Sequence, residues 1–196
     1  MSPAVQRRPP SRMTVAEFLE WDSGDRTGRP WQLVDGEPVA MAPASQPHGA
    51  IQIELGRLIA NHLAEKRSPC RVIGDPGIIP RLRANENYRV PDLGVTCSPE
   101  RAGVMVPDPV LLIEILSPNN QAETRANIWS YTTIPSVQEI LIVHTVRIEA
   151  EILRRGTDGI WPEMPEMIRG TDPLDMRSIG LVLHVNALYR TTVLAT

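Results

Sequence analysis

Two acidic residues that interrupt apolar segments constrain this chain more than any other feature. Asp92 lies within RVPDLGVTC, residues 89–97, and Glu114 lies within LLIEILSPN, residues 111–119. Both segments are short, apolar and rich in aliphatic residues, a composition that predicts buried strands. Even a neutral polar group costs roughly 2 to 7 kcal/mol when it is buried without a partner. Each carboxylate therefore requires a partner that compensates for its burial.

Two kinds of partner are compatible with the residues. If the two segments form adjacent strands, Asp92 and Glu114, which are 22 positions apart (114 − 92), can face the same side of one sheet. Two carboxylates at close range repel each other, and a hard divalent cation with oxygen ligands removes that repulsion. An arginine such as Arg81, Arg83 or Arg125 is an equally good partner, in a structural ion pair. The residues alone leave these two alternatives even.

Length and charge bound the class of protein. A chain of 196 residues suggests one domain with a real core, and a formal net charge of −3 gives no overall attraction to nucleic acid. We see no signal peptide and no apolar run near 18 residues, so we expect a cytoplasmic protein without a membrane span. Residues 1–12 are rich in Pro and Arg and are expected to form a disordered tail, followed by a single domain over 13–196.

Cys70 and Cys97 form no CxxC motif, and we expect both to be buried and reduced.

Hydrophobic periodicity predicts an alternation of helices and strands. Apolar residues at helical spacing predict the longest helix over about 48–66, and Asp35-Gly36 predicts a hairpin turn. Alternation over 147–154 predicts a half-exposed antiparallel strand, whereas 160–176 shows no clear pattern. Helices are expected at about 15–21, 48–66, 121–133 and 186–189, and strands at 31–34, 37–41, 71–74, 78–82, 90–95, 111–116, 139–144 and 147–154. This order indicates an α+β fold with a mixed sheet.

Five short motifs then narrow the interpretation. They are QLVDGE (32–37), APASQPH (42–48), PDLGV (91–95), EILSP (114–118) and YTTIPSVQE (131–139). In this order they resemble the motifs of the Uma family of putative restriction endonucleases, within the PD-(D/E)xK nuclease superfamily. The resemblance runs from about Thr14 to Arg154. It implies a restriction-endonuclease-like core, in which helices flank a central mixed sheet, preceded by an N-terminal helix and a hairpin.

The resemblance also implies an activity and a set of site residues. The implied activity is hydrolysis of DNA phosphodiester bonds by a Mg²⁺-activated water, with Asp92 and Glu114 as the ligands of Mg²⁺ or Mn²⁺. His48, at the start of the long helix, would accept a proton or hold a phosphate, and its alternative role is local hydrogen bonding at the helix start. Gln32 stands where the family has a glutamate on the first strand.

The chain departs from the superfamily at the position of its lysine. That lysine normally lies two residues after the second acid, where this chain has Leu116. In the Uma family the lysine is on the following helix, where this chain has Asn127. An asparagine can orient a water molecule but carries no charge. Two alternatives follow: a metal-dependent endonuclease with an atypical site, or a catalytically degenerate member that binds nucleic acid or protein.

A third possibility concerns assembly. We expect a homodimer, and residues 145–196 are a candidate interface because Trp161, Met164 and Met167 could form an exposed apolar patch. Ordinary packing of these side chains within the domain is the alternative.

Overall fold

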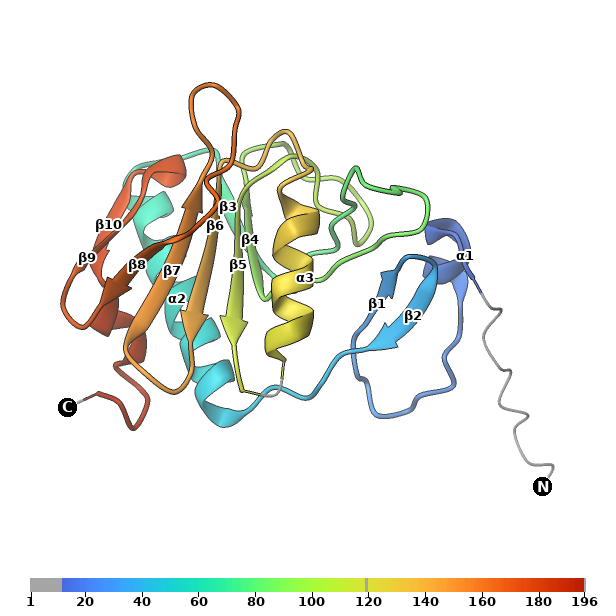
Figure 1. The fold of residues 1–196 in the computed structure, drawn as a ribbon, viewed down its shortest axis with the longest axis horizontal. Coiled ribbons are helices and arrows are strands. Elements are labelled where there is room, and N and C mark those ends of the chain that lie inside the picture. The colour runs from blue at the N-terminus through green and yellow to red at the C-terminus, as the bar shows by residue number, and fades with distance from the viewer. Residues whose placement is uncertain (1–11, 119, 196) are drawn as a thin grey trace.

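A six-stranded mixed sheet with the order β3-β4-β5-β6-β7-β8 runs through the centre of the protein (Figure 1). The computed structural model describes residues 12–118 and 120–195. Strands β5 (Pro109–Leu116) and β6 (Glu139–His144) are parallel and are connected through helix α3 (Gln121–Tyr131). The antiparallel strands are β3 (Arg71–Gly74), β4 (Leu93–Thr96), β7 (Glu149–Arg154) and β8 (Glu166–Arg169). The α+β fold class and the mixed sheet predicted from the sequence are confirmed.

Helices cover both faces of this sheet, with α3 on one face and the longer helix α2 (Gln46–Glu65) on the other (Figure 1). Successive residues of β5 contribute to two different cores. Leu111, Ile113 and Ile115 belong to the core on the α2 side, and Leu112 and Leu116 belong to the core on the α3 side. A strand that is apolar on both faces is typical of a central, doubly covered position. Glu114 alternates with Ile113 and therefore faces α3.

The N-terminal segment forms a smaller layer beside the sheet. Helix α1 (Val15–Glu20) begins with a capping box, in which Thr14 Oγ1 accepts from the Glu17 amide at 3.3 Å and Glu17 accepts from the Thr14 amide at 2.7 Å. Strands β1 (Trp31–Val34) and β2 (Glu37–Ala40) form the hairpin predicted from the sequence. Its turn residues have φ angles of 49° at Asp35 and 83° at Gly36, as a two-residue hairpin turn requires.

The C-terminal segment packs against the α2 side of the sheet. It comprises the hairpin of β9 (Pro173–Met176) and β10 (Leu181–His184) and the 3₁₀ helices η1 (Arg177–Ile179) and η2 (Val185–Tyr189). The short helix expected over 186–189 is therefore present as η2. Strands β8 and β9 occupy most of the second half of the segment for which the sequence showed no pattern.

Three expectations about strands were wrong in detail. The strand expected over 78–82 is absent: Gly77 and Ile78 make only isolated bridges, to Met105 and Arg89. Strand β4 begins one residue after Asp92, which therefore precedes the strand. Strand β7 is buried along almost its whole length rather than half-exposed, because arginine side chains neutralise its glutamates.

Cys70 and Cys97 form a disulfide, which corrects the expectation of two buried, reduced thiols. Cys70 precedes β3 and Cys97 follows β4, and the antiparallel register pairs Arg71 with Thr96. The two cysteines are thus the next opposite pair along the ladder, and Cys97 is exposed. Their separation of 27 residues does not reveal this register.

The tail expected over residues 1–12 lies, apart from Arg12, outside the described residues. Among the helices described, none combines the length and apolarity that a membrane span requires. The assignment of residues 13–196 to one domain stays a prediction.

Candidate functional site

The register of the sheet brings Asp92 and Glu114 together. Leu93 of β4 pairs with Ile113 of β5, so Asp92 stands opposite Glu114 across the two strands. Asp92 Oδ2 accepts a hydrogen bond of 2.6 Å from the Ile115 amide, which fastens its side chain to β5. The side chains of both acids are more than nine-tenths buried. The two acids are therefore neighbours at this end of the sheet, where Asp92 precedes β4 and contacts α2 and Glu114 contacts α3.

His48 contacts Asp92 from the first turn of α2. His48 Nε2 lies 2.8 Å from Asp92 Oδ1, and both side chains are buried. Ser45 is the N-cap of this helix, and its hydroxyl accepts from the His48 amide at 3.4 Å. His48 therefore makes the local contact expected at a helix start and also reaches the acid, so the two roles considered for it are compatible.

Glu114 is held by two neutral donors from α3. Its Oε1 accepts from the Tyr131 hydroxyl at 2.7 Å and from Asn127 Nδ2 at 3.3 Å. Asn127 Nδ2 also lies 3.5 Å from Gln32 Oε1, and the Gln32 amide donates to Glu123. Gln32 and Asn127 are thus joined in one chain of hydrogen bonds that ends on Glu114.

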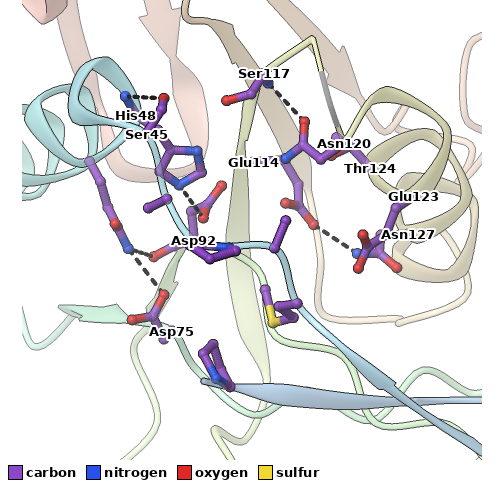
Figure 2. Close-up of a pocket in the computed structure, with 16 residues that line it drawn as sticks. Ser45, His48, Asp75, Asp92, Glu114, Ser117, Asn120, Glu123, Thr124 and Asn127 are labelled. Carbon is purple, nitrogen blue, oxygen red and sulfur yellow. Dashed lines mark hydrogen bonds and ion pairs between the residues drawn. The ribbon is translucent and has the colours of Figure 1, made fainter. Parts of the chain in front are cut away.

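Asp92, Glu114, His48, Asn127 and Glu123 are among the residues that line a cleft of about 400 Å³ (Figure 2). One wall comes from the start of α2, another from the start of α3, and Asp92 and Glu114 lie between them. The segment between β2 and α2 passes over the same cleft. The lining residues are Pro30, Met41, Ala42, Pro43, Ala44, Ser45, His48, Gln52, Asp75, Asp92, Glu114, Ser117, Asn120, Glu123, Thr124 and Asn127.

The electrostatics of the cleft are unfavourable for its own acids. Burial raises the pKa of Glu114 well above its ordinary value, and the charge of Asp92 raises it further. The hydrogen bonds from Tyr131 and Asn127 oppose this rise only in part. Burial and the neighbouring Glu114 carboxylate also raise the pKa of the Tyr131 hydroxyl well above its usual range. A negative charge at Glu114 is therefore only partly compensated by the residues around it.

The arginines considered as structural partners do not pair with Glu114. Arg125 makes a bidentate ion pair with Glu151, and Arg83 pairs with Asp35. In the described residues, no arginine or lysine forms an ion pair with Glu114 or lines the cleft. Arg89 is buried nearby, so it is not available to contact a phosphate directly, and burial lowers its pKa.

The donor set fits a hard divalent cation. Both acids offer carboxylate oxygens to the cleft, and both bonds to Glu114 fall on Oε1, leaving Oε2 without a hydrogen-bond partner in the described part of the chain. Residues 12–118 and 120–195 contain no preformed group of three His, Cys, Asp or Glu side chains suited to a metal. Mg²⁺ commonly uses only one or two protein carboxylates and completes its shell with water and substrate phosphate.

Helical spacing places three further residues at the site. Gln52 lies one turn after His48 on α2, and Glu123 and Tyr131 lie one turn on either side of Asn127 on α3. All three share a hydrogen-bond network with the predicted site residues. They were not among the site residues predicted from the sequence, although their i, i+4 spacing was a signal that could have identified them.

Asp75 joins the cleft from the turn after β3, and no sequence pattern marks it. Its backbone amide donates to the Asp92 carbonyl at 3.1 Å, and Gln52 Nε2 donates to both Asp75 Oδ1 at 3.1 Å and the Asp92 carbonyl at 2.9 Å. Burial, aided by the charge of Asp92, raises the pKa of Asp75. Its φ of 48° lies in the left-handed region, which costs a non-glycine residue about 1 kcal/mol or more.

Comparisons with known proteins agree with this architecture. Two uncharacterized proteins of Synechocystis sp. are similar in sequence, one 29% identical over 91% of this chain and 92% of its own length, the other 23% identical over 76% and 84%. A crystal structure from Anabaena variabilis, titled as that of a putative nuclease, superposes with a TM-score of 0.72 at 20% identity, covering 90% of this chain and 97% of that one. That likeness shows a shared fold. A family model described as "Putative restriction endonuclease" matches residues 15–186, a span that contains both acids, His48 and the whole of α3, and the chain therefore belongs to the Uma2 family.

Proposed function

We propose that this protein is a divalent-cation-dependent endonuclease that hydrolyses phosphodiester bonds in DNA. The observation that carries the proposal is the pair of buried carboxylates, Asp92 and Glu114, which face a cleft whose described lining contains no arginine or lysine. Family membership supports a nuclease, since the family is described as putative restriction endonucleases. Asp92 and Glu114 would hold Mg²⁺ or Mn²⁺, which supplies charge stabilisation and an acidified water when it is bound.

His48 is proposed to handle the proton of the attacking water. Asp92 Oδ1 is its only side-chain partner in the described residues, through Nε2. If Nε2 carries the hydrogen, the carboxylate orients the imidazole and Nδ1 remains able to accept a proton. This tautomer follows from the acceptor character of an ionised Asp92.

Asn127 and Gln32 are proposed to position Glu114 rather than to neutralise the phosphate. Asn127 donates to Glu114 Oε1, and Gln32 links Asn127 to Glu123. An amide cannot supply the charge that a lysine ammonium would place near the transition state. We therefore expect slow turnover compared with an enzyme that retains the lysine.

Plasmid nicking tests the proposal directly. Purified protein with Mg²⁺ or Mn²⁺ should convert supercoiled plasmid to open circles, and Asp92→Ala should abolish this conversion. Glu163→Gln provides a matched control, since Glu163 is exposed and remote in sequence from the cleft residues. If the wild-type protein leaves both supercoiled plasmid and single-stranded DNA intact with both cations, the proposed activity is wrong.

A catalytically degenerate binding protein is the second candidate. The hydrogen bonds that Asn127 and Tyr131 make to Glu114 favour it, because they partly satisfy this acid without a cation. Titration calorimetry with Mn²⁺ separates the candidates in part. A protein that has lost its metal site should show no binding heat that depends on Asp92 and Glu114.

The homodimer and the cytoplasmic location remain predictions. The apolar patch suggested for the interface is smaller than expected, because Trp161 is half-buried and its Nε1 donates to the Thr132 carbonyl at 3.0 Å. Met164 is 77% exposed and Met167 is 38% exposed. Light scattering coupled to size exclusion would establish the mass in solution, and a strict monomer would contradict the dimer.

A further inference from the structure

We infer that the site acts on unpaired, single-stranded DNA rather than on an intact duplex. This inference rests on the proposed function, which it extends by naming the form of the substrate. The first observation is the depth at which the two acids are buried. Asp92 is 6% exposed and Glu114 is 4% exposed, so a phosphate must descend into the cleft to approach a cation held between them.

The size of the cleft is the second observation. Its volume of about 400 Å³ lies at the lower end of the range of roughly 300 to 1,000 Å³ that is typical of small-molecule sites. The segment of residues 41–45, between β2 and α2, forms one wall and limits access from that side (Figure 2). A space of this size suits a short stretch of one strand, whereas a specific duplex complex usually buries about 1,000 Å² or more of protein surface.

Charge is the third observation. The titratable side chains that line the cleft are Asp75, Asp92, Glu114, Glu123 and His48, and no arginine or lysine is among the lining residues that the structure describes. Duplex-binding proteins commonly neutralise about 6 to 10 phosphates with basic side chains. The formal net charge of −3 provides no general substitute for such contacts. A cation held in the cleft can therefore attract one phosphate. The described lining has no arginine or lysine to contact the phosphates on either side of it.

The apolar wall of the cleft suits the sugars and bases of a single strand. The apolar residues that line the cleft are Pro30, Met41, Ala42, Pro43 and Ala44. A single strand, whose bases are already unpaired, can bring one phosphate to the acids while a base or sugar contacts these residues. A duplex must first unpair and unstack, at a cost of about a few kcal/mol.

One labelled oligonucleotide, presented in three forms, tests the inference. The forms are the strand alone, the strand fully paired to its complement, and the same duplex with a central unpaired bubble. With Mn²⁺ we expect the single strand to be cut at least about tenfold faster than the duplex, and the bubble substrate to be cut within the bubble. Equal or faster cleavage of the full duplex would overturn the inference while leaving the proposed nuclease activity intact.

A binding measurement keeps the two ideas separate if no substrate is cut. Absence of cleavage with both Mg²⁺ and Mn²⁺ contradicts the proposed function. Fluorescence anisotropy of the same three oligonucleotides in Ca²⁺, another hard cation with oxygen ligands, then measures the preference itself. Tighter binding of the single strand supports the inference as a statement about the cleft, and equal or tighter binding of the duplex overturns it.

A variant that narrows the cleft tests whether the preference for single-stranded DNA arises in the cleft. Ala44→Trp adds bulk at an exposed position of the cleft wall, and Ile53→Trp adds the same bulk at an exposed position of α2 that does not line the cleft. We expect Ala44→Trp to slow single-strand cleavage, or weaken single-strand binding, by about tenfold, because it competes with the strand for space. Ile53→Trp should behave as wild type, and circular dichroism should show both variants folded. A folded Ala44→Trp protein with unchanged cleavage and binding would contradict the inference.

Discussion

Glu114 and Glu151 occupy equivalent places on one sheet but have opposite surroundings. Ile142 of β6 pairs with Glu114 of β5 on one side and with Glu151 of β7 on the other, so both glutamates face α3. Arg125 donates two bonds of 2.6 Å to Glu151. Glu114 receives hydrogen bonds only from neutral groups of α3 in the described part of the chain.

The difference in partners appears directly in their acidity. Burial opposes ionisation of Glu151, but the bonds from His144 and Arg125 outweigh it and lower its pKa to about 2. Burial and then the charge of Asp92 raise the pKa of Glu114 well above its ordinary value, and in the described residues no arginine or lysine forms an ion pair with it. An arginine pair, one of the two alternatives considered for the acids, is thus found at Glu151, whereas a metal ligand is the role that we propose for Glu114. The burial of a glutamate does not by itself identify its role, whereas the charge of its hydrogen-bond partners distinguishes Glu151 from Glu114.

The largest expected effect is on cleavage. Glu114→Gln should lower metal-dependent plasmid nicking by about a thousandfold, since it removes one of the two carboxylates that we propose as ligands of the cation. Glu151→Gln should retain activity within a few-fold, assayed at a temperature where the variant is folded. Loss of nicking in Glu151→Gln together with full activity in Glu114→Gln would reverse the roles assigned to these residues.

The same two substitutions should have opposite effects on stability. Glu151→Gln is expected to lower the free energy of unfolding by about 2 kcal/mol, because it breaks an ion pair whose acid is buried and whose arginine is half-exposed. Glu114→Gln is expected to leave this free energy unchanged or raise it by up to about 1 kcal/mol, because an uncompensated buried acid is removed. Urea unfolding without divalent cations measures both. A clear destabilisation by Glu114→Gln would indicate that the Glu114 carboxylate has a cationic partner in the folded protein. That result would contradict the contrast drawn between Glu114 and Glu151.

Removal of the Tyr131 hydroxyl should affect metal binding more than folding. Tyr131→Phe deletes the 2.7 Å hydrogen bond to Glu114 Oε1 and frees this ligand to move. Partners of this kind typically contribute 10- to 100-fold to metal affinity, and we expect about a tenfold loss of Mn²⁺ affinity by calorimetry. Trp129→Phe, an exposed change on the same helix, is the control. Unchanged Mn²⁺ affinity in Tyr131→Phe would argue against Glu114 as a ligand.

The smallest expected effect is on the pH dependence of stability. The folded pKa of Glu151 is lowered from 4.5 to about 2, so the unfolded state binds more protons between these values. The stabilisation from this acid is fully present above pH 4.5 and is lost as the pH falls toward 2. Because Arg125 is half-exposed, screening limits this contribution to the order of 1 kcal/mol. Thermal unfolding of wild type and Glu151→Gln should therefore converge as the pH falls through this window, and a constant difference would contradict it.

Local patterns in the sequence were sufficient for much of the fold. The helical spacing of Ile51, Leu55 and Ile59 predicted α2, and Asp35-Gly36 predicted the β1–β2 hairpin. These features depend on residues close in the chain, so the pattern contains the necessary information. The burial of β7 was not predictable in this way, because it depends on arginines from α3 and β8.

The residues of the candidate site likewise differ in whether the sequence could predict them. Asp92 and Glu114 stood out because a carboxylate in an apolar strand is costly wherever the chain folds. The position of Asp75 was hidden, because it depends on a turn with φ of 48° and on the register between β3 and β4. The disulfide between Cys70 and Cys97 was hidden for the same reason.

The sequence by itself determined that two buried acids needed compensation, because the cost of burying charge follows from residue type and apolar context. The tertiary structure decided which partners each acid received. It brought Tyr131 and Asn127 to Glu114 and His48 to Asp92, and it directed Arg125 away to Glu151. The direction in which a helical side chain points depends on residues close to it in the chain. The strand that this side chain contacts depends instead on how the helix crosses the sheet. That crossing is set by packing across the whole core, which no short stretch of sequence contains.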